Sequence, residues 1–161
     1  MKLITVIFAL STSLVVFSQA TVKEITESAR TIKSELRQSL VNKKYDGSKI
    51  TYFEIKNAPI LKEFEIALFL RESYTMYFSG EAAKTNVSMR IYDKPYSSAN
   101  RTLLYDSKDI SGKKITLTTA ELNATYEKAK GNSEKLKYLY VEYGIPRGTP
   151  DFGAVVLIFA Y

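Results

Sequence analysis

Residues 63–68 read Glu-Phe-Glu-Ile-Ala-Leu, and this alternation of side chains decides the fold class. Successive side chains of a β-strand point to opposite faces. Phe, Ile and Leu therefore share one face, and the two glutamates and Ala share the other. A strict period of two over this length predicts a strand with one buried and one solvated face.

The same signal recurs along most of the chain, and no helical pattern separates most of the candidates. The last candidate is apolar on both faces, which is typical of a central strand buried on both sides. The pattern predicts a mainly β protein, an antiparallel β-sandwich of jelly-roll or immunoglobulin-like kind with about eight strands. The strand candidates are residues 50–55, 63–70, 74–78, 87–92, 103–105, 115–117, 138–143 and 154–161.

An amphipathic helix is expected over residues 21–46, before the sandwich domain of residues 47–161. Thr21 and Glu24 fit a capping box, and Asp46-Gly47 fits a helix end. The apolar stripe is narrow, so the helix docks along one line, on its own sandwich or on a partner, in which case it mediates self-association or partner binding. The stripe consists of Val22, Ile25, Ala29, Ile32, Leu36 and Leu40.

A second, shorter helix is expected within the sandwich domain, as an insertion at residues 118–133. Thr118 and Glu121 form a capping-box pair, and Gly131 supplies the stop. An insertion between strands serves either as surface decoration or as a binding element.

Residues 1–20 have the order of parts of a signal peptide. A basic residue, Lys2, precedes a short apolar core, and Ser18-Gln19-Ala20 offers a cleavage site after Ala20. The pattern predicts export to the periplasm or the outside of the cell, with no transmembrane segment in the mature chain. The chain contains no cysteine, so stability rests on the core and not on disulfides.

The formal net charge is +6, yet basic and acidic residues are interspersed. The longest basic runs are pairs, which is typical of a solvated surface and argues against a nucleic-acid partner.

The residue types exclude several catalytic chemistries. With no His and no Cys, the chain lacks the parts of a Ser-His-Asp or Cys-His apparatus, and no glycine-rich phosphate loop occurs. We therefore expect no enzymatic activity, no cofactor and no metal. Two carboxylates suffice for a glycosidase, and Glu63 and Glu65 share one strand face. The alternative function is thus a carboxylate-dependent hydrolase of polysaccharide, although plain alternation also explains both residues.

Three aspartates near predicted strand ends, Asp93, Asp106 and Asp109, are weak candidates for calcium ligands. Ordinary turn chemistry is the simpler interpretation.

Tyrosines provide the candidate binding residues. Exposed Tyr anchors interfaces or stacks on ligands, while Tyr on a half-covered sheet also forms plain cross-strand pairs. The candidates, which fall on the less apolar strand face or in a loop, are Tyr92, Tyr96, Tyr138 and Tyr140.

Two motifs resemble a known group of proteins. Arg90-Ile91-Tyr92-Asp93 and then Arg101-Thr102-Leu103-Leu104-Tyr105-Asp106 look like the paired strands of small exported β-sandwich proteins of Bacteroidota. The resemblance spans roughly residues 64–161 and implies a periplasmic or surface-associated sandwich, similar in shape to the C-terminal sandwiches of secreted peptidases. It implies no catalytic residue, and the insertion at 118–133 departs from it.

These observations together favour an exported, non-enzymatic binding or cell-envelope module. Its expected partner is an envelope protein or a glycan.

Overall fold

The computed structural model describes residues 22–69 and 73–161. The predicted signal peptide, residues 1–20, and the predicted capping residue Thr21 lie outside the described residues. None of the helices within the described ranges has the length and hydropathy needed to cross a membrane.

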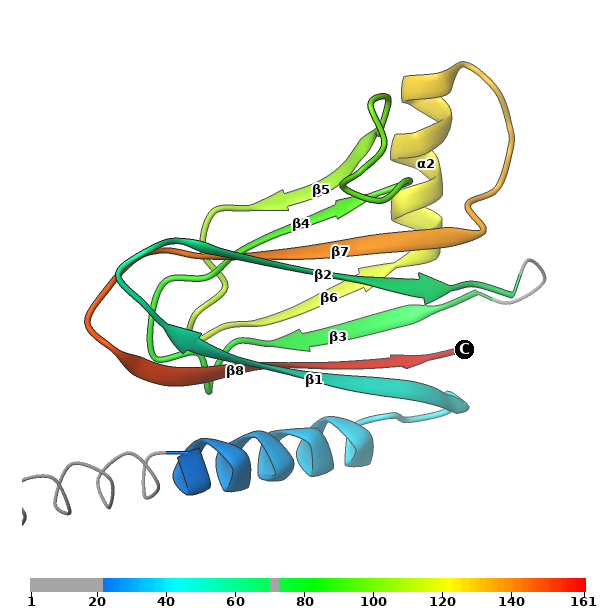
Figure 1. Ribbon diagram of the computed structural model, residues 1–161. Coiled ribbons are helices and arrows are strands. Elements are labelled where there is room, and N and C mark those ends of the chain that lie inside the picture. The colour runs from blue at the N-terminus through cyan, green and yellow to red at the C-terminus, as the bar shows by residue number, and fades with distance from the viewer. Residues whose placement is uncertain (1–21, 70–72) are drawn as a thin grey trace, which may run out of the picture.

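Eight strands form two antiparallel sheets of four, which confirms the predicted β-sandwich (Figure 1). One sheet has the order β1-β8-β3-β6 and the other β2-β7-β4-β5. The strands are β1 (Tyr45–Ile55), β2 (Ile60–Ala67), β3 (Thr75–Ser79), β4 (Ser88–Tyr92), β5 (Leu103–Ser107), β6 (Lys114–Thr118), β7 (Tyr138–Ile145) and β8 (Asp151–Ala160).

The strand order decides between the two expected topologies in favour of a jelly roll. Along the chain, every connection except β4–β5 crosses from one sheet to the other. Eight antiparallel strands wound in this way between two four-stranded sheets are the jelly-roll arrangement.

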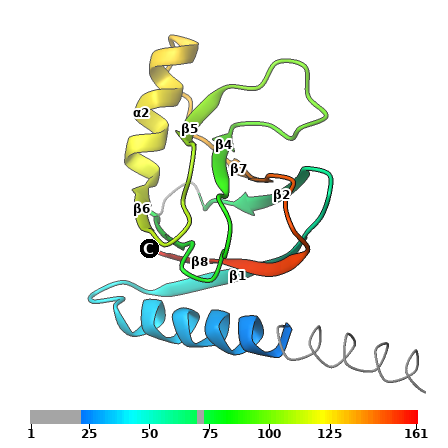
Figure 2. The ribbon, with the colours of Figure 1, turned by 90° about the vertical axis from the view of Figure 1, so that its left-hand side faces the viewer.

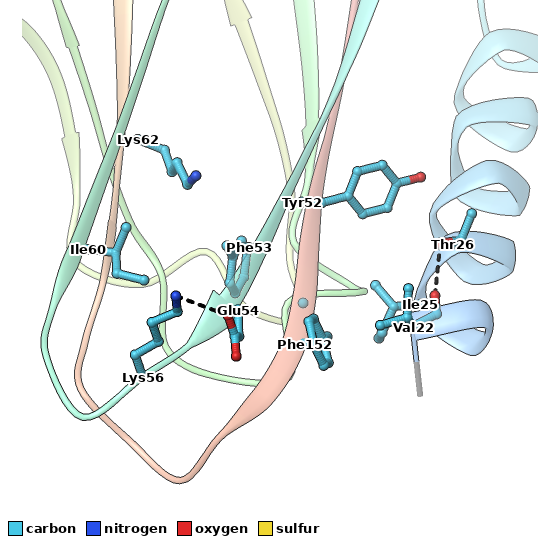
Figure 3. A pocket seen from close by; sticks show the side chains of 11 residues that line it. Val22, Ile25, Thr26, Tyr52, Phe53, Glu54, Lys56, Ile60, Lys62 and Phe152 are labelled. Atoms are coloured by element: carbon cyan, nitrogen blue, oxygen red, sulfur yellow. Dashed lines mark hydrogen bonds and ion pairs between the residues drawn. The ribbon is translucent and has the colours of Figure 1, made fainter. Parts of the chain in front are cut away.

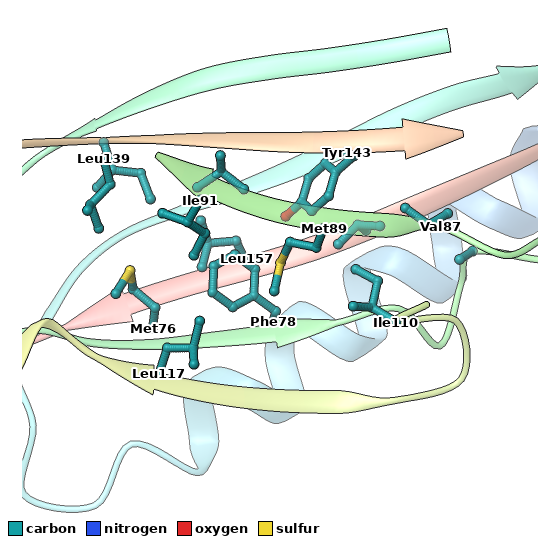
Figure 4. Packing of buried hydrophobic residues seen from close by; sticks show 14 of the residues in the cluster. Met76, Phe78, Val87, Met89, Ile91, Ile110, Leu117, Leu139, Tyr143 and Leu157 are labelled. Atoms are coloured by element: carbon teal, nitrogen blue, oxygen red, sulfur yellow. The ribbon is translucent and has the colours of Figure 1, made fainter. Parts of the chain in front are cut away.

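The main core lies between the two sheets (Figure 4). Ile91 and Val141 face inward from one sheet, and Phe78 and Leu157 face inward from the other. All four side chains are almost fully buried, as the two-residue period requires when one face of each strand packs inward. Leu68 is half-buried and packs against this core.

The N-terminal helix (residues 22–38) covers the outer face of sheet β1-β8-β3-β6 (Figure 1). Ile25, Ala29, Ile32 and Leu36 are buried against a patch of small and β-branched side chains from β8 and the turn after β3. Leu40 packs partly against the same patch, whereas Val22 is 42% exposed. The patch consists of Ala82, Ala154, Val156 and Ile158.

The helix therefore docks on its own sandwich, and this explains the apolar C-terminal run. Strand β8 lies between β1 and β3, with the core on one side and the helix on the other. Both of its faces are buried from residue 153 to residue 158, as the sequence predicts for a central strand.

The predicted end of the helix, residue 46, is wrong, because the helix ends at 38 and β1 begins at Tyr45. Asn42 has a positive φ of 58°, a conformation that Asn tolerates, in the turn between the two elements. Gly47, predicted to stop the helix, lies where the β1–β8 register shifts, and a Cβ there would collide with the ring of Phe159. Gly47 is therefore needed for the irregular register of β1 and for the close approach of the Phe159 ring.

The second helix, α2 (Thr119–Lys130), lies along the side of the sandwich formed by β5 and β6 (Figure 2). Its capping box has the predicted partners, Thr118 and Glu121, and Gly131 closes it in a left-handed conformation. Leu122 from this helix is buried in the main core. The segment therefore covers one side of the sandwich and is part of the fold.

Candidate functional site

Neither helix of residues 22–69 and 73–161 covers the outward side of sheet β2-β7-β4-β5 (Figure 1), which brings together residues that lie far apart in the sequence. We call this surface the open face: the outward side chains of these four strands, together with the loop of residues 93–102. Register pairs Glu65 with Tyr140 and Tyr140 with Tyr92 in one row. The next row pairs Glu63 with Glu142.

All four tyrosines predicted to bind lie on the open face. Tyr92 and Tyr140 are cross-strand neighbours, and Tyr138 is on the same side of β7 as Tyr140. Tyr96 belongs to the loop, and its backbone N–H donates to Glu63 Oε2 at 2.7 Å. The sheet therefore assembles one surface from four dispersed tyrosines.

Arg101 holds the loop on the sheet. Its guanidinium donates to Glu142 Oε1 and lies 3.6 Å from Glu63 Oε2. The guanidinium carbon also lies 3.7 Å from the ring centre of Tyr92 and 5.0 Å from that of Tyr96. These contacts combine two ion pairs with two cation–π interactions.

The charges of Glu63 and Glu142 explain why Arg101 lies between the loop and the sheet. We call this set of contacts the Arg101 clamp. Glu142 is only 2% exposed and stands directly opposite Glu63, an arrangement of like charges that is unfavourable without a cation. Burial alone lowers the pKa of Arg101, but the hydrogen bond and charge of Glu142 outweigh it, so this pKa lies above its ordinary value. Arg101 thus stays charged and offsets the repulsion between the two carboxylates.

The tyrosines are not equally accessible to a ligand. Arg101 covers the ring of Tyr92, and the hydroxyl of Tyr140 donates to Glu65 Oε2 at 2.8 Å. That hydrogen bond, together with burial, raises the pKa of Tyr140 to about 12. Tyr96 and Tyr138 are 64% and 46% exposed, so they are the two that offer free contact surface.

Exposed apolar side chains concentrate on the same face. Among residues 22–69 and 73–161, eight large apolar side chains are exposed, and four of them belong to the open face. Exposed apolar groups that gather on one surface, with polar groups around them, mark interaction sites. The four are Leu61, Tyr96, Leu103 and Tyr138.

The carboxylates of the alternative hydrolase share this face, as predicted, but both have other partners. Glu65 accepts the Tyr140 hydroxyl, and Glu63 accepts the Tyr96 amide and pairs with Arg101. The sequence reasoning did not single out Glu142, the most buried carboxylate of the group.

The three aspartates considered for calcium lie apart and are used separately. Asp93 accepts from the backbone N–H of Thr102, and Asp106 pairs with Arg90 at 3.4 Å. Asp109 accepts from the side chain and backbone of Ser111, and these bonds lower its pKa. They form no common ligand set, and ordinary turn chemistry accounts for them.

A groove of about 430 Å³ lies at the other side of the molecule, beside the start of the N-terminal helix (Figure 3). We call it the edge groove. Val22 and Ile25 line it from the helix, Tyr52 and Phe53 from β1, and Ile60 from β2. Sequence reasoning placed Val22 in the docking stripe, but the structure leaves it 42% exposed in this groove.

Comparison with known proteins adds no family. No protein-family model matches the chain, and no curated protein matches it. A solved structure titled "Bacillus endospore appendages form a novel family of disulfide-linked pili" aligns with a TM-score of 0.38 at 9% identity, covering 75% of this chain and 90% of that one. A structure of infectious bursal disease virus Gx strain aligns with a TM-score of 0.23 at 10% identity, covering 72% and 32%.

Proposed function

We propose that this protein is an exported, non-enzymatic binding module of the cell envelope, and that the open face is its contact surface. The supporting observation is the contrast between the outer faces of the two sheets. The N-terminal helix covers the apolar one, and the other presents exposed tyrosines around a half-buried arginine.

The composition of the open face supports a protein partner first and a glycan second. Tyr and Arg are the residue types that most often dominate binding energy at protein interfaces. Tyr96 and Tyr138 supply exposed ring area, while Glu63 and Arg101 hold the backbone and ring of Tyr96 in place. A contact that is already ordered loses less side-chain entropy when a partner binds.

A hydrolase fits this geometry less well. A glycosidase needs one carboxyl group to donate a proton and a second to act as base or nucleophile. On the open face, the guanidinium of Arg101 engages both Glu63 and Glu142. In the edge groove the one lining carboxylate is Glu54, and it is paired with Lys56 at 3.1 Å.

Capture of partners from the organism's own cell envelope tests the proposal. The purified protein is immobilised, and bound material is scored separately for protein and for glycan. The double variant Tyr96→Ser/Tyr138→Ser is expected to lose the captured partner, because it removes the two exposed anchors without touching the core. N-terminal sequencing of the exported protein is expected to start at Thr21.

The control is Val41→Ser, which removes an apolar side chain that is 74% exposed in the link between helix and β1. Equal capture by Val41→Ser and the unchanged protein, with loss in the double variant, is the expected pattern. If the double variant captures as much partner as the unchanged protein, the open face is not the contact surface. If only glycan is captured, the partner is a glycan and not a protein.

A further inference from the structure

The sandwich has four edge strands, and three of them are protected against pairing with another chain. Strands β5 and β6 have five residues each, and α2 lies against both. Strand β2 follows Pro59 and carries Lys62, Glu63 and Glu65. Short length, a covering helix and charged side chains are the usual features that keep an edge strand from pairing with another chain.

Along its second half, strand β1 has one of these protections, the charged residue Glu54. It is the longest strand, with 11 residues, and among the described residues its ladder is with β8 alone. Its register irregularity lies at the other end, between Tyr45 and Gly47. From residue 51 to residue 55 it reads Thr-Tyr-Phe-Glu-Ile, which contains no proline and one charge.

The edge groove runs along this same half of β1. Its lining includes three successive residues, Tyr52, Phe53 and Glu54. Successive strand residues point to opposite faces of the sheet, so a groove that touches all three lies at the edge of the strand and not over one face. Figure 3 shows Tyr52 pointing toward the helix side and Phe53 toward the interior.

The groove offers apolar contact on both sides of the edge. On the helix side it is lined by Val22, Ile25 and Phe152, and on the β2 side by Phe53 and Ile60. Its volume of about 430 Å³ falls in the usual range for ligand sites. A ligand that fits must hydrogen-bond to a strand edge and place apolar groups alternately to the two sides. An extended peptide has this chemistry.

Charge sets a further requirement at the end of the groove. Lys56 and Lys62 line it together with one carboxylate, Glu54, so the lining has a cationic excess of one. An acidic residue beside the apolar run of the peptide would complement it.

We propose that the second half of β1 is an acceptor for an extended, apolar peptide segment of a partner protein, which adds to sheet β1-β8-β3-β6 as a fifth strand. Its alternate side chains enter the two sides of the edge groove, and an acidic residue follows near Lys62. This acceptor edge is separate from the open face and does not depend on the function proposed for it.

The test uses the purified protein and a synthetic peptide, Lys-Val-Thr-Val-Phe-Val-Thr-Val-Glu with blocked ends. Binding is followed by calorimetry, and hydrogen exchange reports on each backbone amide. Strand addition is expected to slow the exchange of those β1 amides that point away from β8, because they gain a hydrogen-bonded partner. Replacing the central Phe of the peptide by Pro, which cannot donate to the ladder, is expected to abolish binding.

Variants of the protein locate the contact. Tyr52→Lys, on a side chain that is 44% exposed, is expected to weaken peptide binding about tenfold or more through loss of one anchor. Val41→Lys makes a similar change outside the groove, at a side chain that is 74% exposed, and is expected to leave the affinity unchanged. A peptide ending in Lys instead of Glu is expected to bind more weakly.

Three results would overturn the proposal. One is binding that leaves β1 exchange unchanged, and another is no binding up to the solubility limit of the peptide. The third is a dimer of the peptide-free protein in which the β1 amides already exchange slowly, which would show that β1 pairs with a second copy of this chain. Capture by the open face is measured on the same Tyr52→Lys protein, so that failure of one surface is not confused with failure of the other.

Discussion

The two sheets of the sandwich present opposite kinds of outer face. The outer face of β1-β8-β3-β6 has small and apolar side chains along β8, and a helix buries them at Ala154, Val156 and Ile158. The outer face of β2-β7-β4-β5 is aromatic and charged, with a loop fixed to it by Arg101. The same fold thus uses one outer face to anchor its N-terminal segment and leaves the side chains of the other face in contact with solvent.

The two outer faces thus separate two kinds of stabilising interaction. Burial of apolar area stabilises the helix-covered face, and such burial is largely independent of ionic conditions. Ion pairs, cation–π contacts and hydrogen bonds hold the open face, and these respond to pH and to single polar substitutions. The next four predictions test this separation, from the largest effect to the smallest.

The double change Ile32→Asp/Leu36→Asp is expected to have the largest effect. It places two carboxylates against the apolar outer face of β8, without partners, and should lower the free energy of unfolding by about 5 kcal/mol. Thermal or urea unfolding of the monomer measures it. The matched control, Ser28→Asp/Ser34→Asp, adds the same charges on exposed positions of the same helix and should change little. Equal effects of the two doubles would show that the helix is not docked.

The change Ile91→Ala tests the inner side of the open sheet. Ile91 is fully buried between the sheets, so its loss should cost about 2–5 kcal/mol in urea unfolding. Leu68→Ala is the matched variant. Leu68 follows the last residue of β2 and its side chain is only half-buried, so its loss should lower the free energy of unfolding by about 1 kcal/mol. A cost below about 0.5 kcal/mol for Ile91→Ala, the surface value, would contradict the strand register.

Arg101→Ala should be the most damaging single change on the open face. It leaves Glu142, which is 2% exposed, directly opposite Glu63 without the guanidinium that contacts both carboxylates, at a cost of about 3 kcal/mol. Lys23→Ala, on the N-terminal helix, removes the cation of a largely exposed pair with Glu27 and should cost less than about 0.5 kcal/mol. Denaturant midpoints of the two variants measure the contrast, and similar midpoints would show that Arg101 does not neutralise a buried charge.

Tyr140 provides the smallest and most local effect. Its raised pKa means that the neutral phenol is favoured in the folded state, so its contribution to stability is present below pH 10 and is lost as pH rises toward about 12. Glu65→Ala should lower that pKa from about 12 toward the ordinary 10. An NMR titration of labelled tyrosine measures it, with Tyr140→Phe identifying the signal. An unchanged pKa in Glu65→Ala would contradict the hydrogen bond.

The sequence predicts most of the fold because the fold depends on local periodicity. The alternation at 63–68 and 87–92 reports directly which side chains face inward, and the apolar run of β8 reports burial on both faces. The choice between jelly-roll and immunoglobulin-like topology depends on which distant strands pair, and no local pattern carries that information. The helix end was predicted at the wrong residue because Asp46-Gly47 suits a helix stop and an irregular strand start equally well. In the structure it lies at the irregular start of β1.

The candidate site was predictable only in part. Period-two patterning placed Tyr138 and Tyr140 on the outward side of their strand, and it did the same for Glu63 and Glu65. The clamp was not predictable, since it requires the loop of residues 93–102 to fold back so that Arg101 reaches Glu142, 41 positions away. The edge groove likewise depends on where Val22 lies relative to β1, a tertiary relationship.

The pairing of β1 with β8 sets the order of events in folding. Tyr45 is opposite Ala160, so these contacts close a loop of more than 100 residues, and the helix-binding face is incomplete without β8. Contacts of such sequence separation form late and slowly. If the chain is exported as proposed, it passes the membrane before its sandwich can close. Until then the N-terminal helix has no complete surface on which to dock, and its apolar stripe is available to any chaperone that accompanies the chain.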